Sequence, residues 1–434
     1  MHEVIQQAQK QVDQAELYWS KERRVDVRYE NSSLQQVTMN DLSSVALRVI
    51  DAGRLGLTYG TSPDHPELLR DGIAAAALGG EAGFSFSSAR SFPTVQCNSE
   101  QTAHLSSKDL IALCGEVRRP VQRVRPDIAL FIQCTAARTH LTVETTEGTS
   151  AQHEGTALAL SFYAPIKGAG SGVGKYKAAV SPFATPEALV DEFLEWYGWT
   201  EKAYTPKTAR LPVILAPEAS FLLTLPLCAG LSGDAIVKQT SPIADRVGDQ
   251  ILSEKLTIYD DPLRENDPAS RAFDDEGSPC QRRQLVDRGV LKGVLLDLHS
   301  AAKLQAVSTG NGFKRALFVS GTEVSPNPWP GHVVIEGGDL PYKQMLRDVD
   351  EGILLTGGMG FHSGNYPQGQ FAVQALGFYI VRGKVKGRLE RTMVSGNVYS
   401  DMRNIRALSE ERRESAGGFS PYICVDSLQV AGKP

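Results

Sequence analysis

The N-terminal half of the chain begins with a helical hydrophobic pattern and then changes to alternation. Apolar residues recur near helical spacing over residues 2–17, which predicts a first helix. Apolar and polar positions then alternate, which predicts the strands of an antiparallel meander. These strands are expected at Val25–Tyr29, Leu34–Met39, Ser44–Ile50 and Leu55–Tyr59. A helix over Glu67–Leu78 follows, and two glycines end it.

Further helices and strands are predicted before a proline-containing segment of mixed charge. Helices are expected over Ser107–Arg118 and Pro186–Tyr197, the second with Thr185 as its cap and a proline at its first position. Three runs rich in β-branched or aromatic residues predict strands at Ile128–Cys134, His140–Thr146 and Ala157–Tyr163. Residues 200–210 are the best candidate for a domain boundary.

The second half is dominated by short strands that glycine and proline interrupt. Leu211–Ala216 is predicted to be a buried strand, and an apolar helix candidate covers Glu218–Ala229, with Pro226 expected to kink or end it. Hairpins are predicted at Gln284–Leu295 and Phe378–Val385. We therefore expect an α+β fold: an N-terminal antiparallel sheet with packed helices in residues 1–205, and a mainly β, curled or barrel-like domain in residues 206–434.

Composition narrows the class of protein. A chain of 434 residues is too long for one typical core, which agrees with two domains. The net charge of -5 gives no reason to expect nucleic acid as a partner. The six cysteines form no CxxC pair, so reduced and mostly buried thiols are expected. No apolar run is long enough to span a bilayer, and the N-terminus does not resemble a signal peptide, so we expect a cytoplasmic protein without membrane contact.

Several short motifs imitate known sites but lack an essential residue. His153-Glu154 begins like a zinc-binding HExxH helix, but Ala157 stands in place of the second histidine. Residues 169–176 imitate a phosphate-binding loop without its hydroxyl residue, so a flexible loop is favoured. Cys424 with His362 could form a nucleophile and base, but no orienting group is evident. The carboxylates Asp274-Asp275-Glu276 and Asp260-Asp261 could bind a cation or form an acid/base pair, and solvated turns are favoured.

A glycine-rich stretch at residues 356–369 is harder to explain by structure alone. Such a run permits the close approach of another backbone, as a peptide adding a strand to a sheet edge would require. A mobile loop explains it equally well. If the stretch binds peptide, the candidate cleft residues are Gly357, Gly358, Met359, Gly360, Ser363, Gly364, Asn365, Tyr366 and Gly369.

The order of several segments resembles the TldD/PmbA family, known also as the modulators of DNA gyrase. The central resemblance is the strand at 211–216, the apolar helix, the Gly230-Leu-Ser-Gly-Asp234 turn and the Thr257–Pro262 segment. The family's order also continues through Val45–Tyr59, Asp274–Gly277, Gly289–Gly293, Ser308–Asn311 and Gly377–Lys384. Each piece is weak alone, and the ordered set covers nearly the whole chain.

The resemblance implies a subunit from which the metal site is missing. The family's catalytic TldD-type subunit carries an HExxxH zinc motif just before this turn, and the register places Thr224, Leu225 and Ala229 at those three positions. The resemblance therefore implies a PmbA/TldE-like subunit that binds no cofactor itself and catalyses nothing. It would join a TldD-type partner, which holds the zinc, in a protease acting on unfolded or precursor peptides.

Two other functions remain open. The chain could be a stand-alone homodimer, either a peptide-binding protein or a modulating protein. It could also be a hydrolase that uses the carboxylate cluster at Asp274-Asp275-Glu276.

Overall fold

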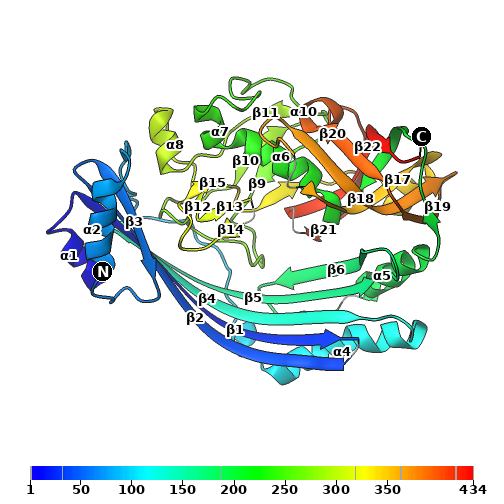
Figure 1. Cartoon of the computed structure of the whole chain (residues 1–434), viewed down its shortest axis with the longest axis horizontal. Helices are drawn as coiled ribbons and strands as arrows, with labels where there is room; N and C mark the ends of the chain where they lie inside the picture. The colour runs from blue at the N-terminus through cyan, green and yellow to red at the C-terminus, as the bar shows by residue number, and fades with distance from the viewer. Residues whose placement is uncertain are drawn as a thin grey trace.

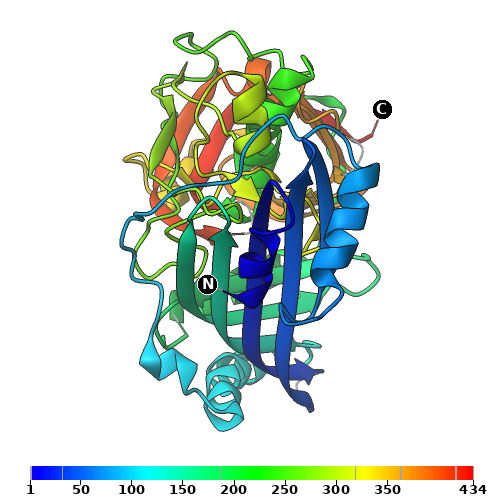
Figure 2. The ribbon, with the colours of Figure 1, turned by 90° about the vertical axis from the view of Figure 1, so that its left-hand side faces the viewer.

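The N-terminal half forms one long, curved antiparallel sheet. The computed structural model describes residues 2–31, 33–185, 187–317, 319–361, 364–415 and 418–433. The six strands lie in the order β3-β2-β1-β4-β5-β6. Figure 1 shows this sheet beneath the C-terminal half of the chain, with α4 on its lower side, and Figure 2 shows the same layering from the side. The strands are β1 (Gln14–Glu30), β2 (Ser33–Asp51), β3 (Arg54–Gly60), β4 (Phe131–Thr145), β5 (Ser150–Pro165) and β6 (Gly172–Ala179).

The predicted meander is confirmed, but its strands are longer than the sequence pattern indicated. The turn between β2 and β3 places Ala52 and Gly53 at φ 48° and 72°, as a tight two-residue hairpin requires. The predicted pairs Leu34–Met39 with Ser44–Ile50, and Ile128–Cys134 with His140–Thr146, merge into β2 and β4. Polar residues interrupt the alternation in the exposed parts of these strands, although the hydrogen-bonded ladders continue.

The helix predicted over residues 2–17 is wrong beyond Ala8. Helix α1 covers Glu3–Ala8, and β1 already contains Ala15 and Leu17, which are both fully buried. These residues have helical spacing, but they form a strand because β1 pairs with β2 and β4. The other helices of this half are α2 (Leu68–Leu78), α3 (Glu100–Ala103), α4 (Ser107–Val124) and α5 (Glu187–Trp199).

The C-terminal half is a mainly β structure that closes into a barrel, as predicted. Five strands form a closed ring in which β8 pairs β17, β17 pairs β18, β18 pairs β20, β20 pairs β22, and β22 pairs β8. Both faces of β8 are buried: Val213 and Leu215 join one core, and Ile214 joins the core shared with the N-terminal sheet. The ring strands are β8 (Ala209–Leu215), β17 (Glu351–Met359), β18 (Gln370–Val381), β20 (Met393–Asn397) and β22 (Gly418–Ala431).

Shorter elements extend this sheet and cover its ends. The remaining strands are β7 (Ala203–Tyr204), β9 (Ile258–Asp260), β10 (Arg283–Asp287), β11 (Val290–Leu291), β12 (Gly312–Phe313), β13 (Arg315–Ala316), β14 (Val319–Ser320), β15 (Asn327–Pro328), β16 (Val333–Ile335), β19 (Lys384–Leu389) and β21 (Ile405–Ser415). The helices are η1 (Pro217–Ala219), α6 (Phe221–Leu231), α7 (Gly233–Val237), α8 (Leu298–Lys303), α9 (Tyr342–Arg347) and α10 (Val398–Asp401). Both predicted hairpins, β10–β11 and β18–β19, are present.

Helix α6 continues past Pro226 to Leu231, so the prediction that Pro226 could end the helix is wrong. A proline inside a helix costs about 3 kcal/mol. Packing outweighs this cost, because Leu222, Leu223, Leu227 and Leu231 are all at most 1% exposed in the C-terminal core. Each buried leucine side chain contributes about 1.5–3 kcal/mol.

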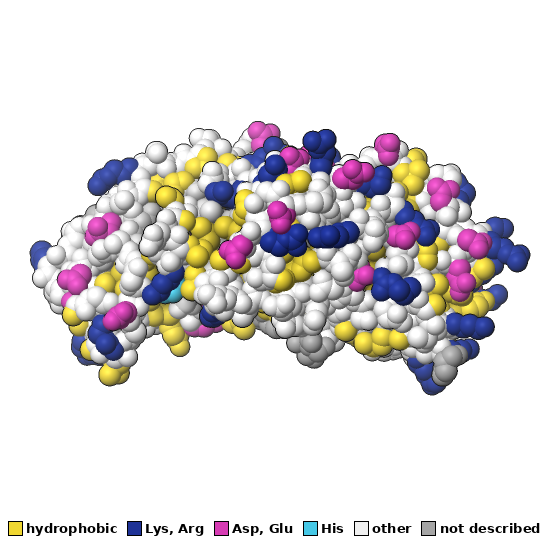
Figure 3. Space-filling model, turned by 90° about the horizontal axis from the view of Figure 1, so that it is seen from above, with side chains coloured by type: hydrophobic (Ala, Val, Ile, Leu, Met, Phe, Trp, Pro, Cys, Tyr) yellow, Lys and Arg dark blue, Asp and Glu magenta, His cyan; other side chains and the backbone are white. Residues whose placement is uncertain are grey.

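The surface, the cysteines and the helix lengths add three further observations. On the face seen in Figure 3, basic and acidic side chains are interspersed, so that face presents no continuous basic surface. All six cysteines are free and buried, as expected. Within the described ranges, no helix combines the length and the apolar character needed to span a bilayer.

Candidate functional site

A cavity of about 750 Å³ lies beside α6. Four side chains of α6 line it, Phe221, Thr224, Leu225 and Cys228, whose spacing puts them on one face of the helix. The strands β6, β17, β18 and β21, the short helix η1 and the segments around residues 267, 315 and 332 contribute further parts of the wall. The cavity therefore combines parts of both halves of the chain.

Two of the three degenerate motif positions face this cavity. Thr224 and Leu225 line it, whereas Ala229 is not among the lining residues and packs against the C-terminal core. Five residues along a regular helix correspond to a rotation of about 140° from the starting face, which explains the divergence of Thr224 and Ala229. A hydroxyl and an aliphatic side chain thus occupy the cavity wall.

The glycine-rich stretch reaches the cavity at Gly357, Gly358 and Phe361. Gly357 and Gly358 line the cavity, and they belong to strand β17 rather than to a loop. Of the other predicted residues, Met359 ends that strand, and Tyr366 is 6% exposed in the C-terminal core. Gly360, Gly364, Asn365 and Gly369 are not lining residues, and Ser363 lies outside the described residues.

One edge of β17 is open where the strand meets the cavity. Strand β8 pairs with β17 only over Ile353–Leu355, and the last bond on that side joins the Ala216 N–H to the Leu355 carbonyl at 2.9 Å. The opposite edge remains paired with β18 as far as Met359. Over residues 356–359, the described part of the chain shows no ladder partner on the β8 side. Backbone groups at such an edge can pair with an added strand.

Aromatic and aliphatic side chains make most of the remaining wall, and Glu218 places a carboxylate in it. The cavity is lined by Trp329, Phe361, Leu317 and Leu376. The Glu218 carboxylate accepts a hydrogen bond from Lys175 Nζ at 2.8 Å, while its Oε2 is buried without a hydrogen-bond partner in the described structure. The cavity is therefore apolar with a few polar groups, as is typical of binding pockets.

Lys175 has a structural role, so residues 169–176 do not form a phosphate-binding loop. Its ammonium is fully buried, lies 2.6 Å from a Glu192 carboxylate oxygen, and sits 3.1 Å from the centre of the Trp196 ring. Residues from Gly172 onward form β6 instead of the expected flexible loop. The neighbouring cations Lys175 and Arg413 overcome burial and lower the pKa of Glu192 to about 2.

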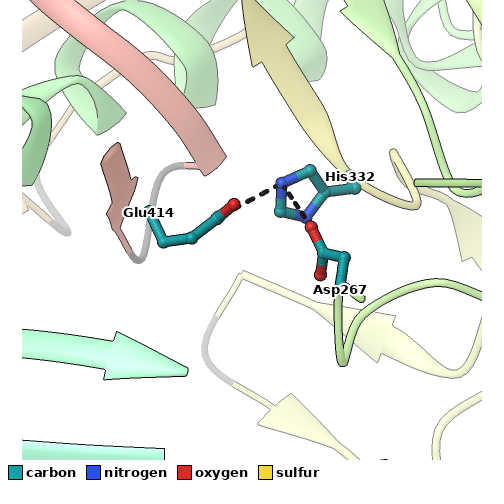
Figure 4. Close-up of side chains that lie close together, drawn as sticks. All are labelled: Asp267, His332 and Glu414. Carbon is teal, nitrogen blue, oxygen red and sulfur yellow. Dashed lines mark ion pairs between the residues drawn. The ribbon is translucent and has the colours of Figure 1, made fainter. Parts of the chain in front are cut away.

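A second polar cluster in the cavity wall brings together Asp267, His332 and Glu414 (Figure 4). The His332 Nε2 atom lies 3.3 Å from Asp267 Oδ2 and 3.4 Å from Glu414 Oε2. Burial alone would lower the pKa of His332, but the two carboxylates outweigh it and raise that pKa. No local motif indicates this cluster, because its residues come from a loop, the position just before β16 and the end of β21.

The carboxylates Asp274-Asp275-Glu276 do not form a solvated turn or an open site. Asp274 and Glu276 are fully buried, and Asp275 is 5% exposed. Asp274 accepts backbone hydrogen bonds from Ser278 and Gly312, and Glu276 accepts one from Leu298. Their oxygens thus accept hydrogen bonds from the surrounding backbone and are buried away from solvent.

The other candidate motifs also prove incomplete. His153 lies on β5, and its Nδ1 is 3.6 Å from the Cys97 sulfur. Burial lowers the pKa of His153 to about 4 and raises that of Cys97, which is opposite to a reactive thiolate–imidazolium pair. Cys424 is buried in β22, and burial raises its thiol pKa to about 11. His362 lies outside the described residues.

Comparisons with curated proteins agree with the resemblance. The chain is 27% identical over 230 residues to the metalloprotease PmbA of Escherichia coli O157:H7, covering 52% of this chain and 47% of the relative. It is 26% identical over 244 residues to the zinc metalloprotease TldD homolog of Saccharolobus solfataricus, covering 53% and 54%. The chain thus spans about half the length of the curated relatives it matches.

Two solved structures share the fold over 99% of this chain. TldE from Thermococcus kodakarensis superposes with a TM-score of 0.89 at 24% identity, covering 99% of both chains. A proposed modulator of a DNA gyrase from Thermotoga maritima superposes with a TM-score of 0.84 at 20% identity, covering 98% of that chain. The family model of the PmbA/TldA metallopeptidase C-terminal domain matches residues 208–432 of this chain, and the model of PmbA/TldA metallopeptidase domain 1 matches residues 15–86. On this evidence, the chain belongs to the PmbA/TldD family of metallopeptidase-like proteins.

Proposed function

We propose that this chain is a non-catalytic subunit of a TldD/TldE-like metalloprotease and binds the peptide substrate in the cavity beside α6. One observation carries the proposal: α6 presents Thr224 and Leu225 to the cavity, where the resemblance places a histidine and a glutamate in the catalytic subunit. A threonine hydroxyl and a leucine cannot supply a zinc ligand set or activate water. The zinc for proteolysis is then supplied by a TldD-type partner.

The cavity is suited to an extended peptide. An added strand would pair with the open edge of β17 at Gly357 and Gly358, and its side chains would meet the apolar wall. Main-chain pairing of this kind depends little on sequence, which suits the binding of unfolded or precursor peptides. We place this activity in the cytoplasm, without membrane or nucleic acid contact.

The first half of strand β2, residues Ser33–Ser44, is our candidate surface for the partner subunit. Strand β3 pairs with β2 only from Val45 onward, which leaves Ser33–Ser44 with an open outer edge in the described structure. Met39 and Leu42 are 60% and 57% exposed on this edge segment. Apolar side chains beside an open edge favour pairing with another chain. The TldD-type subunit is the proposed partner, and a second copy of this chain is the alternative.

The catalytic part of the proposal is tested with an unfolded peptide. The purified chain, with and without a TldD-type subunit from the same source, is incubated with a fluorescently labelled peptide. Cleavage is expected only in the mixture, and cleavage by this chain alone would overturn the assignment. Met39→Glu should weaken association, measured by light scattering after gel filtration, whereas Leu78→Glu at an 88% exposed position should not. A stable homodimer that ignores the TldD-type subunit would favour the stand-alone alternative.

The peptide-binding part is tested separately by filling the cavity edge. A Cβ on Gly357 would lie 3.7 Å from its nearest side-chain neighbour, so the backbone accepts it. Gly357→Val should therefore fold and weaken peptide binding at least tenfold in fluorescence anisotropy. Gly80→Val is the matched control, because a Cβ there meets nothing within 4 Å. Equal peptide affinities for the two variants would contradict binding at β17.

A further inference from the structure

We propose that Asp267, His332 and Glu414 form a divalent metal site in the cavity wall, with zinc or a similar ion as its occupant. The three side chains offer one imidazole nitrogen and two carboxylate oxygens, and these ligand atoms all lie within 4.8 Å of one another. Nitrogen and oxygen donors of this kind suit zinc. The site is separate from α6, and it goes beyond the expectation that only a partner subunit holds a metal.

The distances fit a shared metal better than direct hydrogen bonds. A charge-assisted N–H···O bond is about 2.7–2.9 Å long. His332 Nε2 instead lies 3.3 Å and 3.4 Å from the two carboxylate oxygens, and it is a buried atom without a hydrogen-bond partner in the described structure. Two ligands bonded to one tetrahedral zinc at about 2.0–2.1 Å are about 3.4 Å apart. The two separations from His332 Nε2 match that edge, and the three ligand atoms all lie within 4.8 Å of one another.

Other hydrogen bonds hold the ligands in place without using His332 Nε2. The His332 backbone is fixed on both sides, since its N–H donates to Asp260 Oδ1 at 2.9 Å and its carbonyl accepts from the Asp261 N–H at 2.7 Å. The Asp267 Oδ1 atom accepts from the Ala269 N–H at 2.9 Å. The His332 side chain is only 9% exposed, and Figure 4 shows its ring pointing toward both carboxylates. Such supporting bonds orient metal ligands and raise affinity.

Arg264 is the neighbouring charge that limits the strength of this site. Its guanidinium lies 3.2 Å from Asp267 Oδ2 and 3.2 Å from Glu414 Oε1. When His332 is neutral, the two carboxylates and Arg264 together carry a net charge of about −1. A divalent ion would bring more positive charge than is needed for neutrality, whereas a proton on the imidazole would balance the charge. The proton is therefore the competing occupant. Metal binding should weaken as pH falls, because the imidazole must be neutral to bind metal.

Three protein ligands would leave one coordination position for water or a bound ligand. The cluster lines the same cavity as Thr224 and Gly357, so that position is accessible to whatever occupies the cavity. A metal there would also tie the 267 loop to β16 and β21. The proposal does not depend on peptide binding, since metal can be measured in the absence of any peptide.

The test uses the full chain after removal of metal with a chelator. Titration with Co²⁺, followed by its visible absorption, and with Zn²⁺, followed by calorimetry, should show one ion per chain. Asp267→Asn, His332→Gln and Glu414→Gln should each weaken binding at least tenfold. His104→Ala is the control, because His104 is a 74% exposed imidazole beside Glu100. Absence of binding to the wild-type chain, or equal affinities of all variants, would overturn the proposal.

A spectroscopic measurement on the wild-type chain tests the site even if the variants fail to fold. X-ray absorption of the Co²⁺-loaded wild-type chain should show nitrogen and oxygen ligands, including one imidazole. A spectrum without imidazole, or with sulfur, would place the ion elsewhere and refute the site. If the wild-type chain binds peptide in the cavity but binds no metal, the proposed function stands and only the metal proposal is overturned.

Discussion

Replacing Arg48 with methionine should strongly destabilise the protein, because Arg48 connects its two halves. The Arg48 guanidinium bonds to Glu16 on β1 at 2.6 Å and to Glu276 of the C-terminal half at 2.9 Å. The side chains of Arg48, Glu16 and Glu276 are 4%, 0% and 1% exposed. Arg48→Met keeps most of the apolar stem and removes the only charge that directly pairs both carboxylates among the described residues.

The magnitude follows from leaving two buried acids without this partner. Removing one member of a buried ion pair costs about 3–5 kcal/mol. Lys314 lies nearby with its ammonium buried and without a hydrogen-bond partner, and burial together with Arg48 lowers its pKa to about 8. In Arg48→Met this lysine becomes easier to protonate and compensates in part. The double variant Arg48→Met/Lys314→Met should therefore lose more stability than Arg48→Met alone.

The loss should depend on pH in a defined direction. Burial raises the pKa of Glu276 to about 7, whereas a glutamate in an unfolded chain has a pKa of about 4.3. A carboxyl with a raised pKa stabilises the fold below its unfolded pKa, and that contribution is lost as pH rises through the folded value. Arg48 lowers the pKa of Glu276, so removing Arg48 raises that pKa further, and the loss of stability then continues to a higher pH. The penalty of Arg48→Met should be larger at pH 8 than at pH 5.

Urea unfolding followed by fluorescence, at pH 5 and pH 8, measures these differences. Arg70→Met is the matched control, because the side chain of Arg70 is 66% exposed and its pairs with Glu67 and Asp71 lie at the surface. The control should change the free energy of unfolding by less than about 1 kcal/mol. A loss in Arg48→Met no larger than in Arg70→Met, or a penalty that grows toward pH 5, would refute this account of the network.

Three further predictions test other parts of the structure. Lys175→Met should lower the free energy of unfolding by about 3–5 kcal/mol, since Glu192 and Glu218 lose their buried ammonium, while Lys238→Met at a 65% exposed position should have little effect in the same urea assay. None of the six buried cysteines should react quickly with iodoacetamide at pH 7.5 in the native protein, and mass spectrometry would detect the labelling. Burial raises the pKa of Cys228 in the cavity wall, which keeps its thiol protonated. Rapid labelling of Cys228 in the native protein would contradict its burial. Gly377→Ala should destabilise the β17–β18 pair, because Gly377 has φ 155° and a Cβ would lie 2.0 Å from the Leu354 carbonyl oxygen; thermal unfolding unchanged from wild type would refute the clash.

The reliable sequence predictions were those in which local pattern and tertiary environment agree. Leu211–Ala216 is apolar without alternation, and the structure buries β8 between two cores. Arg288-Gly289 and Arg382-Gly383 have positive φ angles in the predicted hairpins. Such residues carry the turn geometry in their own chemistry, so that no distant contact is needed to predict them.

The failures occur where a distant contact decides the structure. Ala15 and Leu17 fit a helix by spacing, but their neighbours across β1 are Val49 and Leu47 of β2. Pro226 is tolerated because the core around α6 outweighs its cost. In the cavity, Asp267, His332 and Glu414 meet from three separate elements, and no local motif contains two of them. Sequence spacing could identify α6 as an apolar helix, but neither its place in the cavity wall nor the opposing cluster.

Under the proposed function, helix α6 explains how the family's fold can persist without the zinc motif. Its leucines at 222, 223, 227 and 231 are buried in the C-terminal core, whereas Thr224 and Leu225 face the cavity. Substitutions at the core-facing positions would cost about 2–5 kcal/mol each, since they open cavities. The positions that face the cavity bear less of the packing, so their chemistry can change while the fold is retained. The fold therefore constrains the leucines of α6 more strongly than its motif positions, and the remaining cavity, with the open edge of β17, can still serve binding.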